Sequence, residues 1–63
     1  MNIGTIIKEK RIAIGLTQQE LADLVNVDQS FICQIERGTK IPTLLLGKEI
    51  AKVFKCKIDD LVN

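Results

Sequence analysis

The sequence has no histidine, tryptophan or tyrosine, and it has only two cysteines. Cys33 and Cys56 lie far apart in the chain, so we expect neither a zinc site, which needs about four ligands, nor a disulfide framework. The chain also has no glycine-rich phosphate loop and no serine or cysteine placed beside a base. We therefore expect no metal, no cofactor, no small-molecule ligand and no enzymatic activity.

Long hydrophobic runs are also missing. The uninterrupted apolar stretches, such as residues 44–46, are no longer than three residues and far too short to span a bilayer. The first residues lack the basic region and apolar run of a signal peptide. A chain of 63 residues leaves room for one domain, 1–63, which we expect to lie in the reducing cytoplasm, away from membranes.

Charge is nearly balanced, with nine Lys and Arg residues against eight Asp and Glu residues and a net charge of +1. Proteins that bind nucleic acids often carry a clearer basic excess, so this total predicts only modest non-specific affinity for a polyanion. The basic residues cluster in three groups: Lys8, Lys10 and Arg11; Arg37 and Lys40; and Lys48, Lys52, Lys55 and Lys57.

Hydrophobic residues make up 46% of the chain and recur at steps of three and four positions, which predicts helices throughout. Turn residues divide the sequence near positions 15, 26, 38–42 and 55–57. The expected helices cover about 3–14, 18–25, 29–37, 42–54 and 58–62. In the first helix Asn2 is the N-cap, Gly15 is the stop, and the inward stripe consists of Ile3, Ile6 or Ile7, and Ile14.

Two short helices in the middle of the chain are joined by a tight turn. Thr17 and Glu20 have the spacing of a capping box, and Asp28 is the expected N-cap of the following helix. Asn26 tolerates the left-handed backbone conformation that a sharp turn between them requires. Ala22 is small enough for the next helix to cross closely. This arrangement predicts a helix-turn-helix centred on residues 17–37.

The helix over 29–37 has two chemically different faces. At about 100° per residue, Ile32 and Ile35 mark its buried side. The opposite side carries Ser30, Cys33, Gln34 and Arg37, flanked by Gln29. A polar stripe with a basic end suits a groove that has base edges on its floor and phosphates along its walls.

Several short segments stand in a distinctive order and spacing: Arg11, 15–18, 20–22, Ser30, Ile32, 35–38, Pro42, 50–51 and 58–61. Together they resemble the Cro/cI-type (Xre) helix-turn-helix proteins of bacteria and their phages, over nearly the whole chain. The resemblance implies an all-α, compact five-helix lambda-repressor-like fold whose helices 2 and 3 form the helix-turn-helix. It also implies a transcriptional regulator, most simply a repressor, that binds double-stranded DNA as a homodimer at an inverted repeat.

The same resemblance assigns roles to single residues. The base-reading positions are Gln29, Ser30, Phe31 and Gln34, and the phosphate-contacting positions are Thr17, Gln18, Arg37, Thr39 and Lys40. Arg11 and Glu36 match an ion pair that ties the first helix to the third. The implied dimer surface surrounds Leu45, Lys57, Ile58 and Leu61.

The chain departs from the family pattern mainly in its fourth helix. Leu45 and Leu46 occupy positions that are usually polar, whereas Gly47 and Lys48 stand where two leucines are common. We expect one of the two leucines in the core and the other exposed, without choosing between them. Smaller departures are Lys10 in place of leucine, Asn26 in place of glycine and Lys57 in place of a capping serine.

Several alternatives stay open from the sequence. Phe31 packs against the core or touches a thymine methyl group. Cys33 stands in for serine or senses oxidants, while Cys56 aligns with a core position. The lysines at 48, 52, 55 and 57 form a solvated face or a further DNA contact. The chain as a whole is a DNA-binding regulator or a protein-interaction module such as an antitoxin partner.

Overall fold

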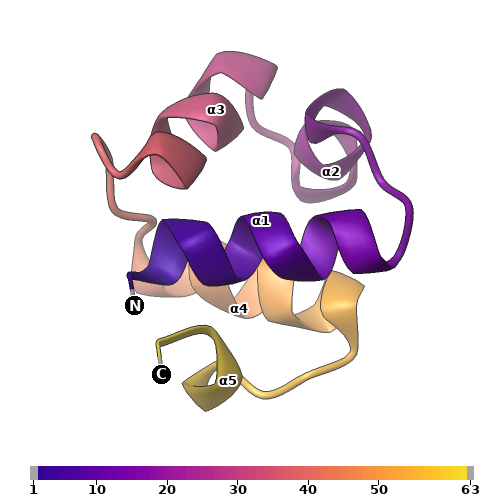
Figure 1. The fold of residues 1–63 in the computed structure, drawn as a ribbon, viewed down its shortest axis with the longest axis vertical. Helices are drawn as coiled ribbons and strands as arrows, with labels where there is room; N and C mark the ends of the chain where they lie inside the picture. Colours follow the sequence, from indigo (N-terminus) through magenta and orange to yellow (C-terminus); the bar gives the residue numbers. More distant parts are fainter. Residues whose placement is uncertain (1, 63) are drawn as a thin grey trace.

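The computed structural model describes residues 2–62, and these residues form five helices and no strand. The helices are α1 (Ile3–Ala13), α2 (Gln18–Val25), α3 (Gln29–Arg37), α4 (Leu44–Phe54) and α5 (Asp59–Val62). In Figure 1, α2 and α3 lie above α1, α4 lies behind and below it, and α5 lies at the bottom. The predicted all-α fold of five helices is confirmed for the described residues.

Side-chain caps start three of the helices as the sequence indicates. Asn2 Oδ1 accepts a hydrogen bond of 2.9 Å from the Thr5 N–H, and the Thr43 hydroxyl accepts one of 3.2 Å from the Leu46 N–H. The Thr17 capping box is complete. Asp28 is the N-cap residue of α3 but its side chain makes no capping hydrogen bond, so the prediction that it caps α3 was wrong in this respect.

The end of α1 differs from the prediction by one residue and in its inward stripe. The helix stops at Ala13, and Ile14 is a cap residue that is 50% exposed. Ile14 is therefore not part of the inward stripe, which was predicted wrongly. The stripe continues from Ile7 to Arg11 instead, because one helical turn beyond Ile7 brings the chain back to the same face.

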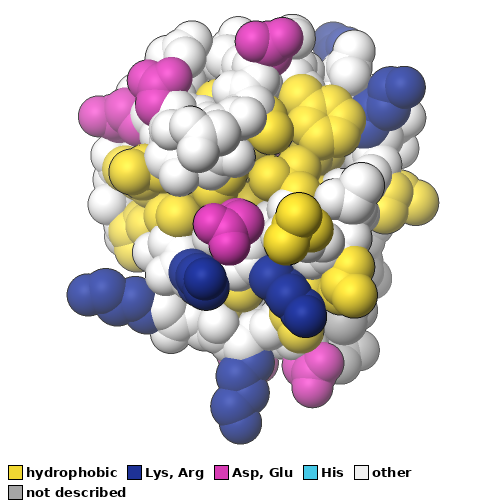
Figure 2. All heavy atoms as spheres, turned by 180° about the vertical axis from the view of Figure 1, so that it is seen from behind, with side chains coloured by type: hydrophobic (Ala, Val, Ile, Leu, Met, Phe, Trp, Pro, Cys, Tyr) yellow, Lys and Arg dark blue, Asp and Glu magenta, His cyan; other side chains and the backbone are white. Residues whose placement is uncertain are grey.

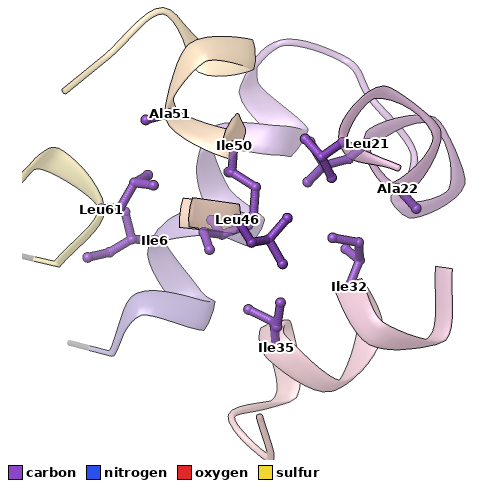
Figure 3. Close-up of a cluster of buried hydrophobic side chains, with 11 residues drawn as sticks. Ile6, Leu21, Ala22, Ile32, Ile35, Leu46, Ile50, Ala51 and Leu61 are labelled. Carbon is purple, nitrogen blue, oxygen red and sulfur yellow. The ribbon is translucent and has the colours of Figure 1, made fainter. Parts of the chain in front are cut away.

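The core lies where all five helices converge (Figure 3). Six large side chains in it are completely buried, and Val27, Phe31 and Cys56 are among the half-buried residues packed against it. Cys56, which the sequence aligned with a core position, packs against the core but is only half-buried. The fully buried large side chains are Ile7, Leu21, Ile32, Ile35, Ile50 and Leu61.

The register of α4 settles which of its leucines is inside. Leu46 is 8% exposed and belongs to the core, while Leu45 is 72% exposed. Gly47 is buried, and a β-carbon there would stand 3.1 Å from Ile58 Cδ1. Ile58 therefore fills the space over position 47.

Four of the turns have a residue with positive φ, the first being Gly15 after α1 with φ 78°. Asn26 ends α2 with φ 60° and ψ 46°, and Gly38 ends α3 with φ 86° and ψ 8°. Both residues lie at helix ends that the sequence predicted. Lys55 ends α4 with φ 56° and ψ 42°, a conformation that is unfavourable for a residue with a long side chain.

Candidate nucleic-acid interface

The outer face of α3 is polar and uncovered. Ile32 and Ile35 are 0% exposed and fix the inner side of the helix, whereas Gln29, Ser30 and Arg37 are exposed. In Figure 1, α3 lies at the edge of the molecule, with no other helix over its outer side. A partner as large as a DNA duplex can therefore reach this face.

The four predicted base-reading residues all lie on α3, but they are not equally exposed. Gln29 and Ser30 are exposed, Gln34 is half-buried, and Phe31 is half-buried and packed against the core. Phe31 thus has a structural role, and part of its side chain remains accessible. Cys33 is half-buried and carries a free thiol.

The turn after α3 is tightly held. The carbonyl oxygen of Gln34 accepts hydrogen bonds from the N–H groups of Thr39 (3.0 Å) and Lys40 (3.3 Å) and from the Thr39 hydroxyl (3.1 Å). Arg37, Thr39 and Lys40 are all exposed in or beside this turn. The segment therefore presents two basic side chains from a fixed backbone, directly beyond α3.

Hydrogen bonds between side chains and the backbone also hold the start of α2. The Glu20 N–H donates to the Thr17 hydroxyl (3.0 Å), and the Thr17 N–H donates to Glu20 Oε1 (2.8 Å). The N–H groups of Gln18 and Gln19 stay at the open end of the helix, where the helix dipole favours an anion.

Arg11 and Glu36 form a buried, two-bond ion pair between α1 and α3. Arg11 Nε donates to Glu36 Oε2 at 2.7 Å and Arg11 Nη2 donates to Glu36 Oε1 at 3.0 Å; the side chains are 10% and 2% exposed. Arg11 Nη1 also donates to the Leu16 carbonyl oxygen at 2.7 Å. The predicted pair is present, and it ties the α1–α2 turn to α3.

Hydrogen bonding to Glu36 raises the pKa of Arg11 above its ordinary value; burial opposes the rise, and attraction to the same carboxylate adds to it. The guanidinium is thus charged at every pH at which the protein would be studied.

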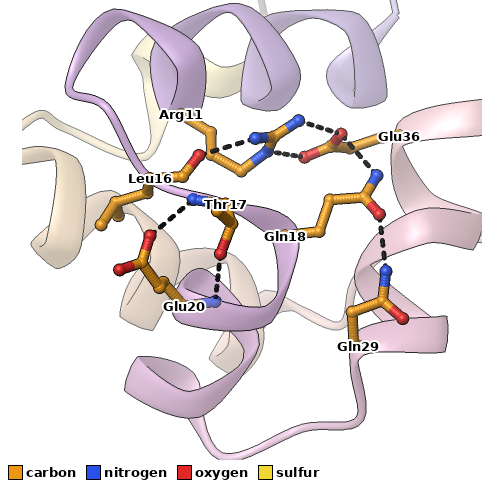
Figure 4. A network of polar contacts seen from close by, with 7 residues as sticks. All are labelled: Arg11, Leu16, Thr17, Gln18, Glu20, Gln29 and Glu36. Atoms are coloured by element: carbon orange, nitrogen blue, oxygen red, sulfur yellow. Dashed lines mark hydrogen bonds and ion pairs between the residues drawn. The ribbon is translucent and has the colours of Figure 1, made fainter.

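The ion pair continues into a chain of side chains that reaches the outer face of α3 (Figure 4). Gln18 Nε2 donates to Glu36 Oε1 at 3.0 Å, and Gln29 Nε2 donates to Gln18 Oε1 at 2.8 Å. The sequence assigned Gln18 only to a phosphate contact. No sequence pattern marks this link, because it depends on three side chains from α2 and α3 meeting in space.

Gly4 is a second feature that sequence reasoning missed. A β-carbon there would collide with the Ile35 carbonyl oxygen and would stand 3.2 Å from Glu36 Cα. Gly4 and Arg11 lie two turns apart on the same face of α1, so both contact the C-terminal half of α3. This spacing is the signal that could have identified Gly4.

The predicted dimer surface is only partly at the surface. Leu45 and Lys57 are exposed and Ile58 is half-buried, but Leu61 is 0% exposed. Leu61 is a core residue, which corrects its assignment to a surface. Ile41 and Leu44, which are 80% and 67% exposed, lie close to Leu45 in the sequence and were not selected from it.

Comparison with known proteins agrees with this geometry. The Helix-turn-helix family model matches residues 7–61. An uncharacterized HTH-type transcriptional regulator of Archaeoglobus fulgidus is 44% identical over 57 residues, which cover 90% of this chain and 81% of the relative.

Two solved structures are similar throughout. The P22 c2 repressor in complex with a synthetic operator gives a TM-score of 0.94 at 25% identity, covering 100% of this chain and 96% of that one. SinR, the master regulator for biofilm formation, was solved in complex with DNA. It gives a TM-score of 0.87 at 28% identity, and the match covers 94% of this chain and 95% of SinR.

The fold and the polar outer face of α3 thus define a helix-turn-helix domain. The chain belongs to the helix-turn-helix family of transcriptional regulators, of the Xre or Cro/cI type. This is a family of regulators and not of enzymes. Among the described residues, no helix is long and apolar enough to cross a membrane, and no group of side chains has the composition of a metal site.

Proposed function

We propose that the chain is a sequence-specific repressor that binds double-stranded DNA as a dimer, with α3 of each copy in the major groove. The observation that carries the proposal is the uncovered outer face of α3, where Gln29, Ser30 and Arg37 are exposed on a helix whose other side is fixed in the core. The operator-bound P22 c2 repressor and DNA-bound SinR, which have similar folds, support it.

The base-reading residues in this proposal are Gln29, Ser30 and Gln34. A glutamine pairs with adenine through two hydrogen bonds in the major groove, to N6 and N7, and such a pair contributes about 1–3 kcal/mol of discrimination. Phe31 offers its accessible edge to a thymine methyl group while the rest of the ring supports α3.

Phosphate contacts hold the helix in the groove from both ends. Beyond α3, Arg37, Thr39 and Lys40 lie in or beside the turn that the Gln34 carbonyl fixes. At the other end, Thr17 and Gln18 lie at the start of α2, whose open N–H groups and dipole favour a phosphate. These contacts supply affinity for any duplex, and the base contacts supply selectivity.

The dimer follows from the size of the site. One recognition helix reads only a few base pairs, and a two-fold dimer places two of them about 34 Å apart, which matches half-sites about 10 bp apart. We assign the contact between copies to the exposed apolar side chains of Ile41, Leu44 and Leu45, with Lys57 and Ile58 at its margin. Figure 2 shows exposed hydrophobic side chains next to lysines or arginines on the face opposite the view of Figure 1.

Selection of bound duplexes from a random pool tests the proposal most directly. We expect an inverted repeat with half-sites spaced by one helical turn, bound by two copies. Enrichment of single half-sites would contradict the dimer, and a selected pool with no common sequence would contradict sequence-specific binding. Tagged pull-down that returns a stoichiometric protein partner and no DNA would favour the protein-interaction module instead.

A further inference from the structure

We propose that Asn2 is a further DNA-contacting residue, whose side-chain NH₂ group donates to the phosphate that the turn after α3 binds. The proposal rests on the DNA-binding function proposed above and adds to it a residue that the sequence indicated only as a helix cap. In this mechanism one amide has two tasks, since its oxygen caps α1 and its nitrogen contacts DNA.

The cap of α1 fixes the orientation of the Asn2 amide. Asn2 Oδ1 accepts a hydrogen bond of 2.9 Å from the Thr5 N–H. A backbone N–H only donates, so the atom that faces it must be the amide oxygen and not the nitrogen. The NH₂ group makes no hydrogen bond with any other of residues 2–62, and Asn2 is exposed. Both N–H bonds of the amide are therefore left for a partner.

This NH₂ group lies beside the turn after α3. A β-carbon on Gly38 would stand 4.0 Å from Asn2 Nδ2. Gly38 follows Arg37 and precedes Thr39 and Lys40, and all of these residues are exposed. In Figure 1 the start of α1 lies next to the segment that runs from α3 to α4. The amide and the turn are far apart in the sequence, but they form one exposed surface.

The backbone of the turn has few donors to spare for a phosphate. The N–H groups of Thr39 and Lys40 and the Thr39 hydroxyl all donate to the Gln34 carbonyl oxygen, at 3.0, 3.3 and 3.1 Å. The Gly38 N–H also donates to carbonyl oxygens of α3. Thr39 therefore supports the phosphate contact by fixing the turn. The donors that remain are the two basic side chains and the Asn2 amide beside them.

An uncharged amide next to two cations suits a phosphate. Hydrogen bonds to a charged acceptor are stronger than those between neutral groups, and asparagine is among the side chains that donate to DNA phosphates. No acidic residue is present at position 2 or among residues 37–40, and the neighbouring Glu36 is buried in its ion pair with Arg11. A phosphate therefore meets no carboxylate within this surface.

Two substitutions separate the capping task from the DNA contact. Asn2→Asp keeps a capping oxygen, and its negative charge is favourable at the start of a helix, so the fold stays as stable or gains stability. It replaces the NH₂ group with an oxygen that repels phosphate. Asn2→Gly removes the side chain at little cost to the cap. Asn26→Asp is the control, because it adds the same charge at an exposed residue that none of the proposed contacts uses.

Binding titrations on a duplex selected from the random pool and on one of unrelated sequence measure the effect. We expect Asn2→Gly to weaken binding to both about threefold to tenfold, as for one lost hydrogen bond, without changing the salt slope. We expect Asn2→Asp to weaken both at least about tenfold, because repulsion is added to the loss. Asn26→Asp should cost less than about twofold, since salt screens an isolated surface charge. Urea unfolding establishes that each variant is folded.

A second measurement locates the contact. In duplexes that carry a single uncharged methylphosphonate, one position should remove the effect of Asn2→Asp. The same position, or the one next to it, should remove the effect of Lys40→Ala. A merely structural role for Asn2 would instead give the same loss at every position, which would overturn the proposal.

The outcomes distinguish this proposal from the proposed function. If Asn2→Asp weakens binding no more than Asn26→Asp does, while Lys40→Ala still weakens it, Asn2 makes no phosphate contact and the proposed function stands. If the unmodified protein binds no duplex at all, both proposals are wrong.

Discussion

Gly4 of α1 lies so close to the backbone of Ile35 in α3 that a β-carbon at position 4 would overlap the Ile35 carbonyl oxygen. On the same face of α1, Arg11 holds Glu36, the next residue of α3, through two hydrogen bonds. A close backbone approach and an ion pair therefore fix the C-terminal half of α3 at adjacent positions.

Gly4→Ala should lower the free energy of unfolding by about 3 kcal/mol, at the upper end of the range for overpacking, because the obstacle is backbone and cannot rotate away. Gly15→Ala is the matched control. A β-carbon at position 15 would have no atom within 4 Å. The only cost of this substitution is the strain of a φ of 78°, about 1 kcal/mol. Urea unfolding followed by circular dichroism measures both. Stabilisation by Gly4→Ala, as helix propensity alone would give, would contradict the structure.

Glu36→Ala should destabilise the fold by about 3–5 kcal/mol, because it leaves the Arg11 guanidinium buried without its partner. Glu49→Ala provides the comparison. Its ion pair with Lys52 joins side chains that are 46% and 78% exposed at 3.5 Å, and surface pairs of this kind contribute about 0.5 kcal/mol or less. Equal effects of the two substitutions on the thermal midpoint would show that the buried pair is not a main structural tie.

Lys55→Gly should raise the free energy of unfolding by about 1 kcal/mol, because glycine adopts the left-handed conformation of this helix end without the β-carbon clash. Lys48→Gly, seven residues earlier inside α4 at an exposed position, should instead lower it by about 0.5–1 kcal/mol. Both variants lose one lysine charge, so a difference in sign between them in urea titrations isolates the backbone effect.

Leu45→Glu should leave the unfolding free energy of the monomer within about 0.5 kcal/mol, because the side chain is 72% exposed. On a duplex with two half-sites it should abolish the joint binding of two copies, because it places like charges in the proposed contact. Ile12→Glu, at a side chain 56% exposed on α1, is the control and should retain joint binding. Sedimentation on duplexes with one and two half-sites compares them.

Lys40→Ala should weaken binding to every duplex alike and reduce the slope of log affinity against log salt by about one unit, since one phosphate contact is lost. The same change at Lys48 should leave the slope unaltered if the lysines of α4 are a solvated face. A reduced slope for Lys48→Ala would assign that face to DNA instead. Titrations at four or five salt concentrations are sufficient.

The helix-turn-helix could be predicted because its signals are local. The capping box at Thr17, the left-handed turn at Asn26 and the glycine stop at Gly38 each depend on residues within a few positions of one another, and all three are present. The Arg11–Glu36 pair is long-range, and it was found only through the resemblance to a known family.

The errors have a common physical origin. Ile14 was judged by its place in the apolar pattern and Leu61 by the family resemblance, but burial depends on where a helix ends and on what packs over it. In the same way, hydrophobicity could not choose between Leu45 and Leu46, because adjacent leucines are equally apolar. Only the position of α4 against the rest of the core separates them.

The fit of Ile58 over Gly47 makes residues 44–62 a unit of exchange. Consider a chimera that takes only α4 from a relative with a bulky residue at position 47. That side chain would collide with Ile58 and push α5 away. A chimera that takes only α5, with a small residue at position 58, would leave a cavity over Gly47. The two segments must be transplanted together if a hybrid regulator is to retain its native C-terminal packing.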